Sequence, residues 1–322
     1  MKPARLPVLL RAVVLPAALV LCAASTASAA PHVWLDTERG PIVLELDPLR
    51  APLTSAHFLQ AVDEGFYDGL VFHRTVPDFV IQAGRLDGSA RTRTRSPNPT
   101  VPSERSNGLA HVPGAVAIAL PPGPAYNGGT TEFFIDTVAN AHLDGEYTVF
   151  AHVVHGLPLA KSIGAGSNYS NGIPFRPVLI RRAVAGDAFP VLPLHTGAWF
   201  DPDNSGRGIS LEVAHADGGD GTPLLVAYWY DYLDGDQVWM SGAAPFEWGD
   251  SEVTIALART GGGEFGEAFD PGLVAVDADF GELTVRFSAC DRASFRYDTS
   301  LGEGSMEMVR ITVPDGQTCA QQ

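Results

Sequence analysis

Short alternating runs of apolar and polar residues dominate the chain and predict a mainly β protein. Two such runs, 32–37 and 42–46, flank the turn-forming tetrapeptide Glu38-Arg39-Gly40-Pro41, a pattern that predicts a β-hairpin. Further β-branched and aromatic runs in the first half are typical of strands. These runs are 70–75, 78–83, 115–120, 131–135, 149–155 and 177–182.

Helical periodicity occurs twice in the same half. In the segment Ser55 to Glu64 the residues Phe58, Leu59 and Val62 share one face, which predicts an amphipathic helix. Thr54 is the expected N-cap and Gly65 the expected stop. A second, shorter helix is expected at 157–163.

The last third of the chain shows no helical period. Apolar runs at 225–232 and 237–240 flank the turn Leu-Asp-Gly-Asp, which predicts a hairpin. Four more short runs, followed by turn residues, predict an all-β sandwich or barrel of about 125 residues. These runs are 253–257, 273–276, 283–287 and 306–312. The Gly- and Pro-containing segment 185–194 is the expected linker, so we expect one domain at 30–184 and a β-rich accessory domain at 195–322.

The first 29 residues have the pattern of a secretory signal peptide. Lys2, Arg5 and Arg11 are followed by an apolar run over 12–24 and the small residues Ala27-Ser28-Ala29, which form a cleavage site. The run is too short for a membrane span, and Leu21 before Cys22 argues against a lipoprotein signal. The sequence therefore predicts an exported protein, periplasmic or secreted, with residues 1–29 removed.

Charge narrows the range of partners. The chain has 21 Lys and Arg and 37 Asp and Glu residues, and removal of Lys2, Arg5 and Arg11 leaves 18 − 37 = −19 charges. So acidic a protein is repelled by phosphate backbones, which argues against a nucleic-acid partner. About 290 mature residues exceed a single comfortable core, which favours two domains.

Cysteine usage predicts a disulfide. With Cys22 removed, only Cys290 and Cys319 remain in an exported chain. Two cysteines in an oxidising compartment usually pair, and closing this loop would stabilise the fold by roughly 3 to 4 kcal/mol. Two free buried thiols are the alternative.

The candidate chemistry lies between Val71 and Gly84. Two predicted strands surround Val76-Pro77 and bring Arg74, Gln82 and an apolar cluster together. No titratable nucleophile accompanies them. The arrangement indicates a site that holds a peptide rather than one that hydrolyses it.

These residues carry a resemblance to a known family. Phe72-His73-Arg74, Pro77, Phe79 and Gln82-Ala83-Gly84 are similar to the central signature of the cyclophilins, and the matches continue in order over about residues 31–184. Thr131-Glu132-Phe133-Phe134-Ile135 and Ala141-His142-Leu143-Asp144-Gly145 resemble the family's two later groove segments. The resemblance implies a closed antiparallel barrel with two capping helices, and an exported, bacterial-like peptidyl-prolyl cis-trans isomerase. It also implies proline-containing polypeptide clients and no cofactor or metal.

The resemblance also implies roles for individual residues. Arg74 would be the catalytic residue, donating a hydrogen bond to the prolyl nitrogen as the amide twists. Gln82 would fix the peptide backbone. The remaining substrate-binding positions are Phe79, Val80, Ala119, Glu132, Phe134, His142, Leu143 and Tyr147.

Four of these positions depart from the family pattern. Glu132 replaces a glutamine, His142 an aromatic residue, Val80 a methionine and Tyr147 a histidine. Glu132 would place an anion beside Arg74, where it would either lock the guanidinium or compete with the substrate for it. The alternative function is therefore a catalytically weak proline-peptide-binding or chaperone module, tethered to a surface or protein partner by its C-terminal domain.

The C-terminal region resembles an uncharacterised β-rich module of secreted bacterial proteins, which carries no known activity. The residues concerned are Trp199-Phe200-Asp201-Pro202, Ser205-Gly206-Arg207-Gly208 and the late cysteine pair. The segment from Asp201 to Glu212 has the spacing of a calcium loop, but a tight turn between strands fits its neighbours better. Tyr228, Tyr230 and Tyr232 are either ordinary half-buried sheet aromatics or a stacking surface for a sugar or an extended peptide.

Overall fold

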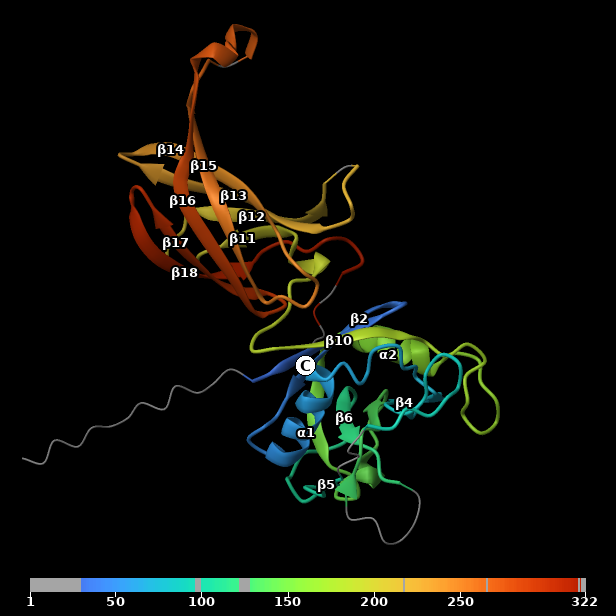
Figure 1. Cartoon of the computed structure of the whole chain (residues 1–322). Coiled ribbons are helices and arrows are strands. Elements are labelled where there is room, and N and C mark those ends of the chain that lie inside the picture. Colours follow the sequence, from blue (N-terminus) through green and yellow to red (C-terminus); the bar gives the residue numbers. More distant parts are fainter. Residues whose placement is uncertain are drawn as a thin grey trace, which may run out of the picture.

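Two β-rich units follow one another along the chain, as Figure 1 shows. The computed structural model describes residues 30–95, 100–121, 128–216, 218–264, 266–317 and 319. The expected signal peptide, 1–29, lies outside the described residues. The described part confirms the mainly β fold class.

The first unit contains an eight-stranded antiparallel sheet with strand order β10-β1-β2-β9-β6-β8-β4-β3, a two-stranded sheet β5-β7, and two α-helices. The strands are β1 (His32–Thr37), β2 (Gly40–Leu46), β3 (Arg74–Val76), β4 (Val80–Ala83), β5 (Val101–Pro102), β6 (Ala115–Ile118), β7 (Gly128–Gly129), β8 (Phe133–Asp136), β9 (Val149–His155) and β10 (Ile180–Gly186). The helices are α1 (Pro52–Asp63), α2 (Leu157–Gly164) and the 3₁₀ turn η1 (Ala141–Leu143).

The pairing of this sheet confirms the predicted hairpin and curls the sheet around on itself. β1 and β2 pair from His32↔Glu45 to Thr37↔Gly40. At the two ends of the strand order, the Phe72 amide donates to the Val178 carbonyl at 2.9 Å and the Ile180 amide donates to the Leu70 carbonyl at 2.8 Å. These bonds connect the segment before β3 with the start of β10.

Aromatic rings fill the core between α1 and the sheet. The Phe58 ring lies 5.0 Å from the rings of Tyr67 and Phe150 and 5.3 Å from that of Phe133, and all four side chains are fully buried. Such rings bury large apolar areas and dominate the stability of a core. The predicted face of Phe58 and Val62 on α1 is therefore the face that holds the helix to the sheet.

The cap of α1 differs from the prediction. The helix begins at Pro52 rather than after Thr54, because proline fits the first helical turn, where its missing N–H has no intrahelical partner. The cap comes from a distant loop. The carboxylate of Glu104 accepts hydrogen bonds from the Leu53 amide (3.0 Å), the Thr54 amide (2.8 Å) and the Thr54 hydroxyl (2.7 Å).

The second unit is a closed eight-stranded barrel in which each strand pairs with the next and β11 with β18. Its strands are β11 (Gly197–Phe200), β12 (Gly208–His215), β13 (Pro223–Leu233), β14 (Asp236–Pro245), β15 (Glu252–Gly262), β16 (Val274–Ala289), β17 (Arg292–Thr299) and β18 (Gly302–Arg310). Three 3₁₀ turns accompany them, η2 (Pro193–His195), η3 (Gly266–Ala268) and η4 (Pro271–Leu273). The far ends of β15 and β16 project beyond the barrel as a long hairpin (Figure 1).

The structure shows a turn, rather than a calcium loop, after Asp201, but does not test the stacking role predicted for the tyrosines of β13. The Asp201 carboxylate accepts hydrogen bonds from the Asp203 amide (3.0 Å), the Asn204 amide group (2.9 Å) and Arg207 (2.8 Å), which holds a turn between β11 and β12. Tyr230 and Tyr232 are each 52% exposed on the outer face of β13. Their ligand-binding role stays a prediction.

The segment 185–194 is packed against the second unit. Its apolar side chains Phe189, Val191, Leu192 and Leu194 are buried in the same cluster as Trp199. Glycine and proline led to the expectation of a linker, but these interspersed apolar residues decide its structure, because exposing them costs free energy.

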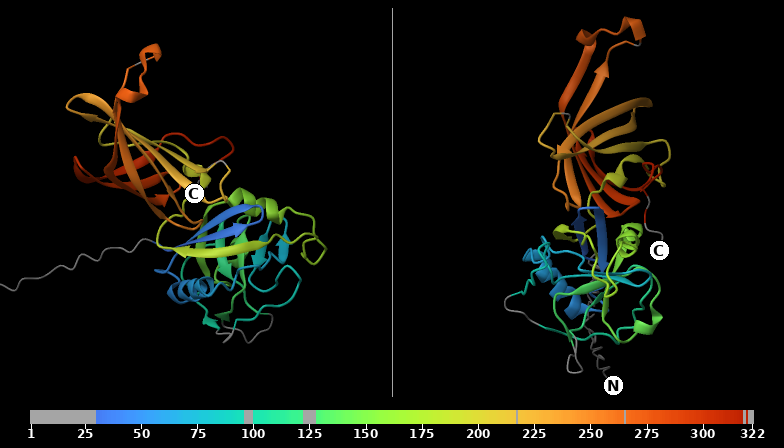
Figure 2. Two further views of the ribbon diagram at one scale, coloured as in Figure 1. Left: turned by 45° about the horizontal axis from the view of Figure 1, so that its top comes forward. Right: turned by 90° about the vertical axis from the view of Figure 1, so that its right-hand side faces the viewer.

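The same cluster joins the two units. Trp34 and Val43, on the outer face of β1 and β2, belong to it. Trp34 stacks on Trp248 at 6.5 Å, and the Arg182 guanidinium lies 5.0 Å from the Trp34 ring while it donates to the Trp248 carbonyl at 2.9 Å. Both views in Figure 2 show the barrel beside the β1, β2 and β10 side of the first sheet.

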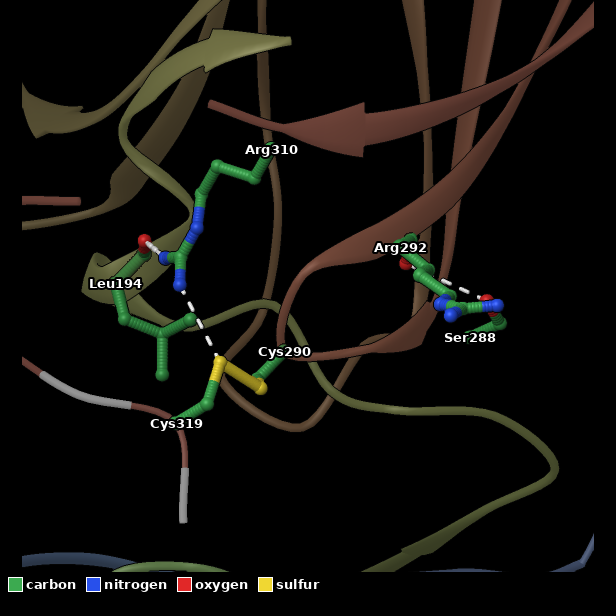
Figure 3. The surroundings of a disulfide bond; sticks show 6 residues. All are labelled: Leu194, Ser288, Cys290, Arg292, Arg310 and Cys319. Carbon is green, nitrogen blue, oxygen red and sulfur yellow. Dashed lines mark hydrogen bonds between the residues drawn. A yellow bond between two sulfur atoms is a disulfide. The ribbon is translucent and has the colours of Figure 1, made fainter. Parts of the chain in front are cut away.

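The predicted disulfide is confirmed. Cys290 and Cys319 are bonded, with 5.8 Å between their Cα atoms. Arg310 donates to the Leu194 carbonyl and to the Sγ atom of Cys319, which ties the disulfide to β18 and to η2 (Figure 3). Within the described residues, no helix is long and apolar enough to cross a membrane.

Candidate active site

The hairpin of β3 and β4 carries the central pair of candidate residues. Arg74 and Gln82 are directly opposite each other in its register. Both strands are shorter than predicted. β3 begins at Arg74 rather than at residue 70, and β4 begins at Val80 because residues 77–79 form the turn, in which Asp78 adopts a left-handed conformation with φ of 52°. Phe72 lies before β3 and is fully buried in the core.

A pocket of about 250 Å³ opens beside this hairpin. It has a polar edge of Arg74 and Gln82 and an apolar wall from β4, β8, η1, the turn before β4 and the residues that follow β6. Its lining residues are Arg74, Phe79, Val80, Gln82, Ala119, Leu120, Phe134, Leu143 and Tyr147. The structure thus brings together all the sequence-predicted residues except Glu132 and His142, and it adds Leu120.

The Arg74 guanidinium lies over the edge of this pocket. Its central carbon is 5.9 Å from the centre of the Phe79 ring, a distance at which a cation is attracted to an aromatic face. Within the described part of the chain, no ion pair joins Arg74 to a carboxylate. Its donors therefore remain available to a bound peptide.

Glu132 was expected beside Arg74, but its contacts in the described residues are with other side chains. Its carboxylate accepts a hydrogen bond from the Gln82 amide group at 2.8 Å, and lies 3.4 Å from Arg85 Nε and 3.3 Å from His73 Nε2. Burial opposes ionisation, but His73, Arg85 and Gln82 together lower the pKa of the Glu132 carboxyl below its ordinary value. The anion is thus neutralised by Arg85 and holds the Gln82 side chain.

His142 lies outside the pocket lining. It is exposed on η1, and its ring stacks on that of Phe79 with centroids 5.8 Å apart and an interplanar angle of 17°. It therefore covers the outer side of the pocket wall.

Sequence reasoning missed a buried polar cluster beneath the pocket. His111 Nδ1 lies 2.7 Å from an oxygen of Asp136, and both side chains are fully buried. Asn140 donates to the other oxygen at 2.6 Å. The sequence contains one signal for this cluster. Asp136 directly follows the apolar run Phe133-Phe134-Ile135, where a buried carboxylate without a partner would be costly.

A larger hollow of about 1180 Å³ lies elsewhere, beside β2, β6 and β9. Its charged lining residues are Glu45, Asp47, Arg50 and Lys161. Its lining contains no facing pair equivalent to Arg74 and Gln82. The smaller pocket is therefore the better candidate for recognising a short apolar ring next to a peptide bond.

Comparison with known proteins assigns the first unit. Residues 32–185 match the family model "Cyclophilin type peptidyl-prolyl cis-trans isomerase/CLD". The peptidyl-prolyl cis-trans isomerase ppi1 of Schizosaccharomyces pombe is 36% identical over 154 residues, which are 48% of this chain and 98% of that protein. The chain belongs to the cyclophilin family.

A bacterial relative agrees with this assignment. The cyclophilin is 34% identical to peptidyl-prolyl cis-trans isomerase A of Dickeya dadantii over 169 residues, 50% of this chain and 87% of the relative. Among solved structures, a Cryptosporidium parvum cyclophilin matches with a TM-score of 0.42 and 20% identity, over 49% of this chain and 98% of that one.

The predicted resemblance is therefore confirmed, and this cyclophilin is a peptidyl-prolyl cis-trans isomerase. The match ends at residue 185. The barrel of β11–β18 is an addition to the family's domain.

Proposed function

We propose that this cyclophilin isomerises X-Pro bonds of exported polypeptides in the pocket beside β3 and β4, with Arg74 as the catalytic residue. The observation that carries the proposal is the pocket itself, whose lining combines Arg74 and Gln82 with the apolar side chains of Phe79, Phe134 and Leu143. No covalent step is needed, because the reaction only rotates one amide bond.

The chemistry of that bond defines what the pocket must do. Amide resonance sets a barrier of about 18 to 20 kcal/mol to rotation. As the bond twists, the prolyl nitrogen becomes pyramidal and gains a lone pair that accepts a hydrogen bond. A donor that reaches this lone pair stabilises the twisted amide more than either planar isomer, which is the requirement for catalysis. Arg74 is always charged and has several donors in one plane, so it suits this role.

The other pocket residues hold the substrate in place. Phe79, Val80, Phe134 and Leu143 form the apolar wall for the proline ring, and Ala119 and Tyr147 bound it. Gln82, fixed by its hydrogen bond to Glu132, presents its carbonyl oxygen to a peptide amide. Glu132 and His142 act from outside the pocket, by holding Gln82 and by covering Phe79.

The contacts of Glu132 also bear on the alternative function, a binding module with a quenched arginine. That alternative requires Glu132 to neutralise Arg74. Instead Arg85 lies 3.4 Å from the carboxylate, which supports an active enzyme.

Catalysis is tested by following cis-to-trans exchange in a short X-Pro peptide. Arg74→Ala is expected to lower kcat/KM by about 100-fold or more, since removal of one transition-state donor costs about 2.7 to 4 kcal/mol. Arg74→Lys keeps the charge but loses the planar donor set and is expected to recover only part of the activity. Full activity in Arg74→Ala would refute the assignment.

Export is supported by the pattern of residues 1–29 and by the disulfide, since disulfides persist in oxidising compartments. In a bacterial host, the full chain is expected outside the cytoplasm, cleaved after Ala29 and with Cys290 and Cys319 oxidised. Leu19→Arg, which interrupts the apolar run, is expected to block processing. A processed and exported Leu19→Arg chain, or an unprocessed wild type, would contradict export by this signal.

A further inference from the structure

The buried cluster beneath the pocket contains His111, Asp136 and Asn140. The Asp136 carboxylate receives one hydrogen bond on each oxygen, at 2.7 Å with His111 Nδ1 and at 2.6 Å from the Asn140 side chain. Because a carboxylate only accepts, the shared proton is on His111 Nδ1. The plane of the imidazole ring is thereby fixed. A buried carboxylate is costly unless it is fully bonded in this way.

The fixed imidazole contacts two residues of the pocket wall. The His111 ring stacks on Phe134 with centroids 5.7 Å apart and an interplanar angle of 10°. It meets Tyr147 edge-on at 6.3 Å, and Phe134 and Tyr147 are in turn perpendicular at 5.2 Å. The three rings form one packed unit whose orientation depends on the bond between His111 and Asp136.

The same cluster reaches the rest of the wall through the backbone. The Asn140 side chain also donates to the Phe79 carbonyl at 3.1 Å. The Leu143 amide donates to the Asn140 carbonyl at 2.8 Å, and the Asn140 amide donates to the His111 carbonyl at 2.8 Å. Phe79, from the turn after β3, and Leu143, from η1, are therefore connected to the same buried group as Phe134.

We propose that His111, Asp136 and Asn140 are positioning residues that set the spacing of the proline-binding wall. The inference rests on the proposed function of the pocket, because it assigns the cluster a role in that pocket. Four wall residues from separate segments, Phe79, Phe134, Leu143 and Tyr147, contact the cluster or are bonded to it. Arg74 makes no hydrogen bond to the cluster within the described part of the chain, and lies opposite Gln82 in the hairpin.

The separate roles of the wall and of Arg74 predict that changes in the cluster affect KM, whereas a change of Arg74 affects kcat. The wall contacts the proline ring in the ground state and in the twisted state alike, and loss of such uniform binding raises KM while kcat stays the same. Asp136→Leu keeps the volume but removes both acceptors. It is expected to raise KM about five- to tenfold and to change kcat less than about twofold. Arg74→Ala is expected to lower kcat instead.

A conservative variant separates positioning from general stability. In Asp136→Asn the side-chain oxygen still accepts from Asn140, and its nitrogen donates to His111 Nδ1 once the imidazole proton moves to Nε2. This variant is expected to restore a KM close to that of wild type. As a control, His32→Leu breaks a histidine–carboxylate pair away from the pocket, that of the buried His32 with the half-exposed Glu45 at 3.4 Å on β1 and β2, and is expected to leave KM unchanged.

The experiment measures kcat and KM for an X-Pro peptide and, by calorimetry, the Kd of the same peptide for each full-length variant. If Asp136→Leu does not fold, Asn140→Ala, which removes the bonds to Asp136 and to the Phe79 carbonyl, is expected to raise KM by an intermediate factor. A wild-type KM and Kd in a folded Asp136→Leu or Asn140→Ala protein would overturn the proposal, as would Asp136→Asn being as impaired as Asp136→Leu. Full activity in Arg74→Ala would instead refute the catalytic assignment, while the Kd values still test the role of the cluster.

Discussion

At the scale of single residues, Arg85 determines whether Glu132 disturbs the pocket. Glu132 is partly buried, with a side chain 24% exposed, and it is the acceptor for Gln82. Arg85 is the guanidinium that faces it. Arg74 lies opposite Gln82, the residue that Glu132 accepts from, so without Arg85 the anion would be attracted to Arg74 and would compete with the substrate.

The pairing of Glu132 with Arg85 predicts that substitutions of these two residues have unequal effects on kcat/KM. Arg85→Gln is expected to lower kcat/KM about three- to tenfold, an effect of up to about 1.4 kcal/mol, because Glu132 then turns to Arg74. Glu132→Gln alone is expected to change kcat/KM less than about twofold, since glutamine still fits beside Gln82. The double variant is expected to recover the activity lost in Arg85→Gln. Peptide exchange assays on the four proteins form a double-mutant cycle, and a double variant as slow as Arg85→Gln would contradict this explanation.

The residues of the pocket were predictable to different degrees. Arg74, Phe79 and Gln82 lie in one continuous stretch with recognisable spacing, so the sequence identified them before the structure placed them together. His111 and Asp136 are 25 positions apart and belong to no short motif. Their pairing depends on the tertiary fold, and so does the partner of Glu132, which local alternation cannot predict.

At the scale of elements, α1 depends on a residue far away in the chain. Glu104 lies 50 positions after Thr54 and accepts three hydrogen bonds from the first turn of the helix. Its negative charge also lies at the positive end of the helix dipole. Since α1 carries Phe58 into the aromatic core, the cap stabilises more than the helix itself.

Removal of this cap has a measurable cost. Glu104→Ala is expected to lower the free energy of unfolding by about 1 to 2 kcal/mol, the usual loss for a helix cap. Thr54→Val, which removes only one hydroxyl bond, is expected to cost less. Urea unfolding at neutral pH compares the two variants with wild type. A larger loss for Thr54→Val would show that Thr54 is the main cap, as the sequence alone suggested.

The strands show that sequence patterns predict where an element lies better than they predict where it ends or which strand it pairs with. β1 and β9 were predicted with their observed bounds, because apolar runs with clear turn residues on both sides mark them. β17 was missed, since its inward residues Ala293 and Phe295 alternate with arginines and polar residues and resemble a loop. The closed order of the barrel depends on the contact between β11 and β18, which are more than 90 residues apart.

At the scale of the whole molecule, two buried histidines lie where the units meet. His155 ends β9 of the first unit, and His195 lies in η2, stacked on Phe287 at 3.8 Å. Burial lowers the pKa of His155 to about 4, and the charge of Arg310 acts in the same direction. Burial lowers the pKa of His195 well below its ordinary value, with further contributions from Arg310 and His155.

Both shifts predict that acid weakens the junction. The unfolded chain binds protons at these histidines near pH 6.5, whereas the folded chain keeps His155 neutral to about pH 4. Their stabilising effect is therefore complete above about pH 6.5 and is lost as the pH falls toward 4. For His155 the loss amounts to about 3 kcal/mol at most, and His195 adds to it in the same sense.

Urea unfolding of the full chain at pH 7.5, 6.0 and 5.0 tests this pH dependence. The transition midpoint is expected to fall with pH over a range in which most carboxylates stay ionised. The pKa values of His57 and His152 are also lowered by burial, so part of the slope belongs to the first unit. His155→Gln is expected to flatten the slope, because glutamine needs no proton, whereas His215→Gln, at an exposed position on β12, is expected to leave it unchanged. An equal slope in wild type and His155→Gln would mean that the junction does not respond to protonation of this histidine.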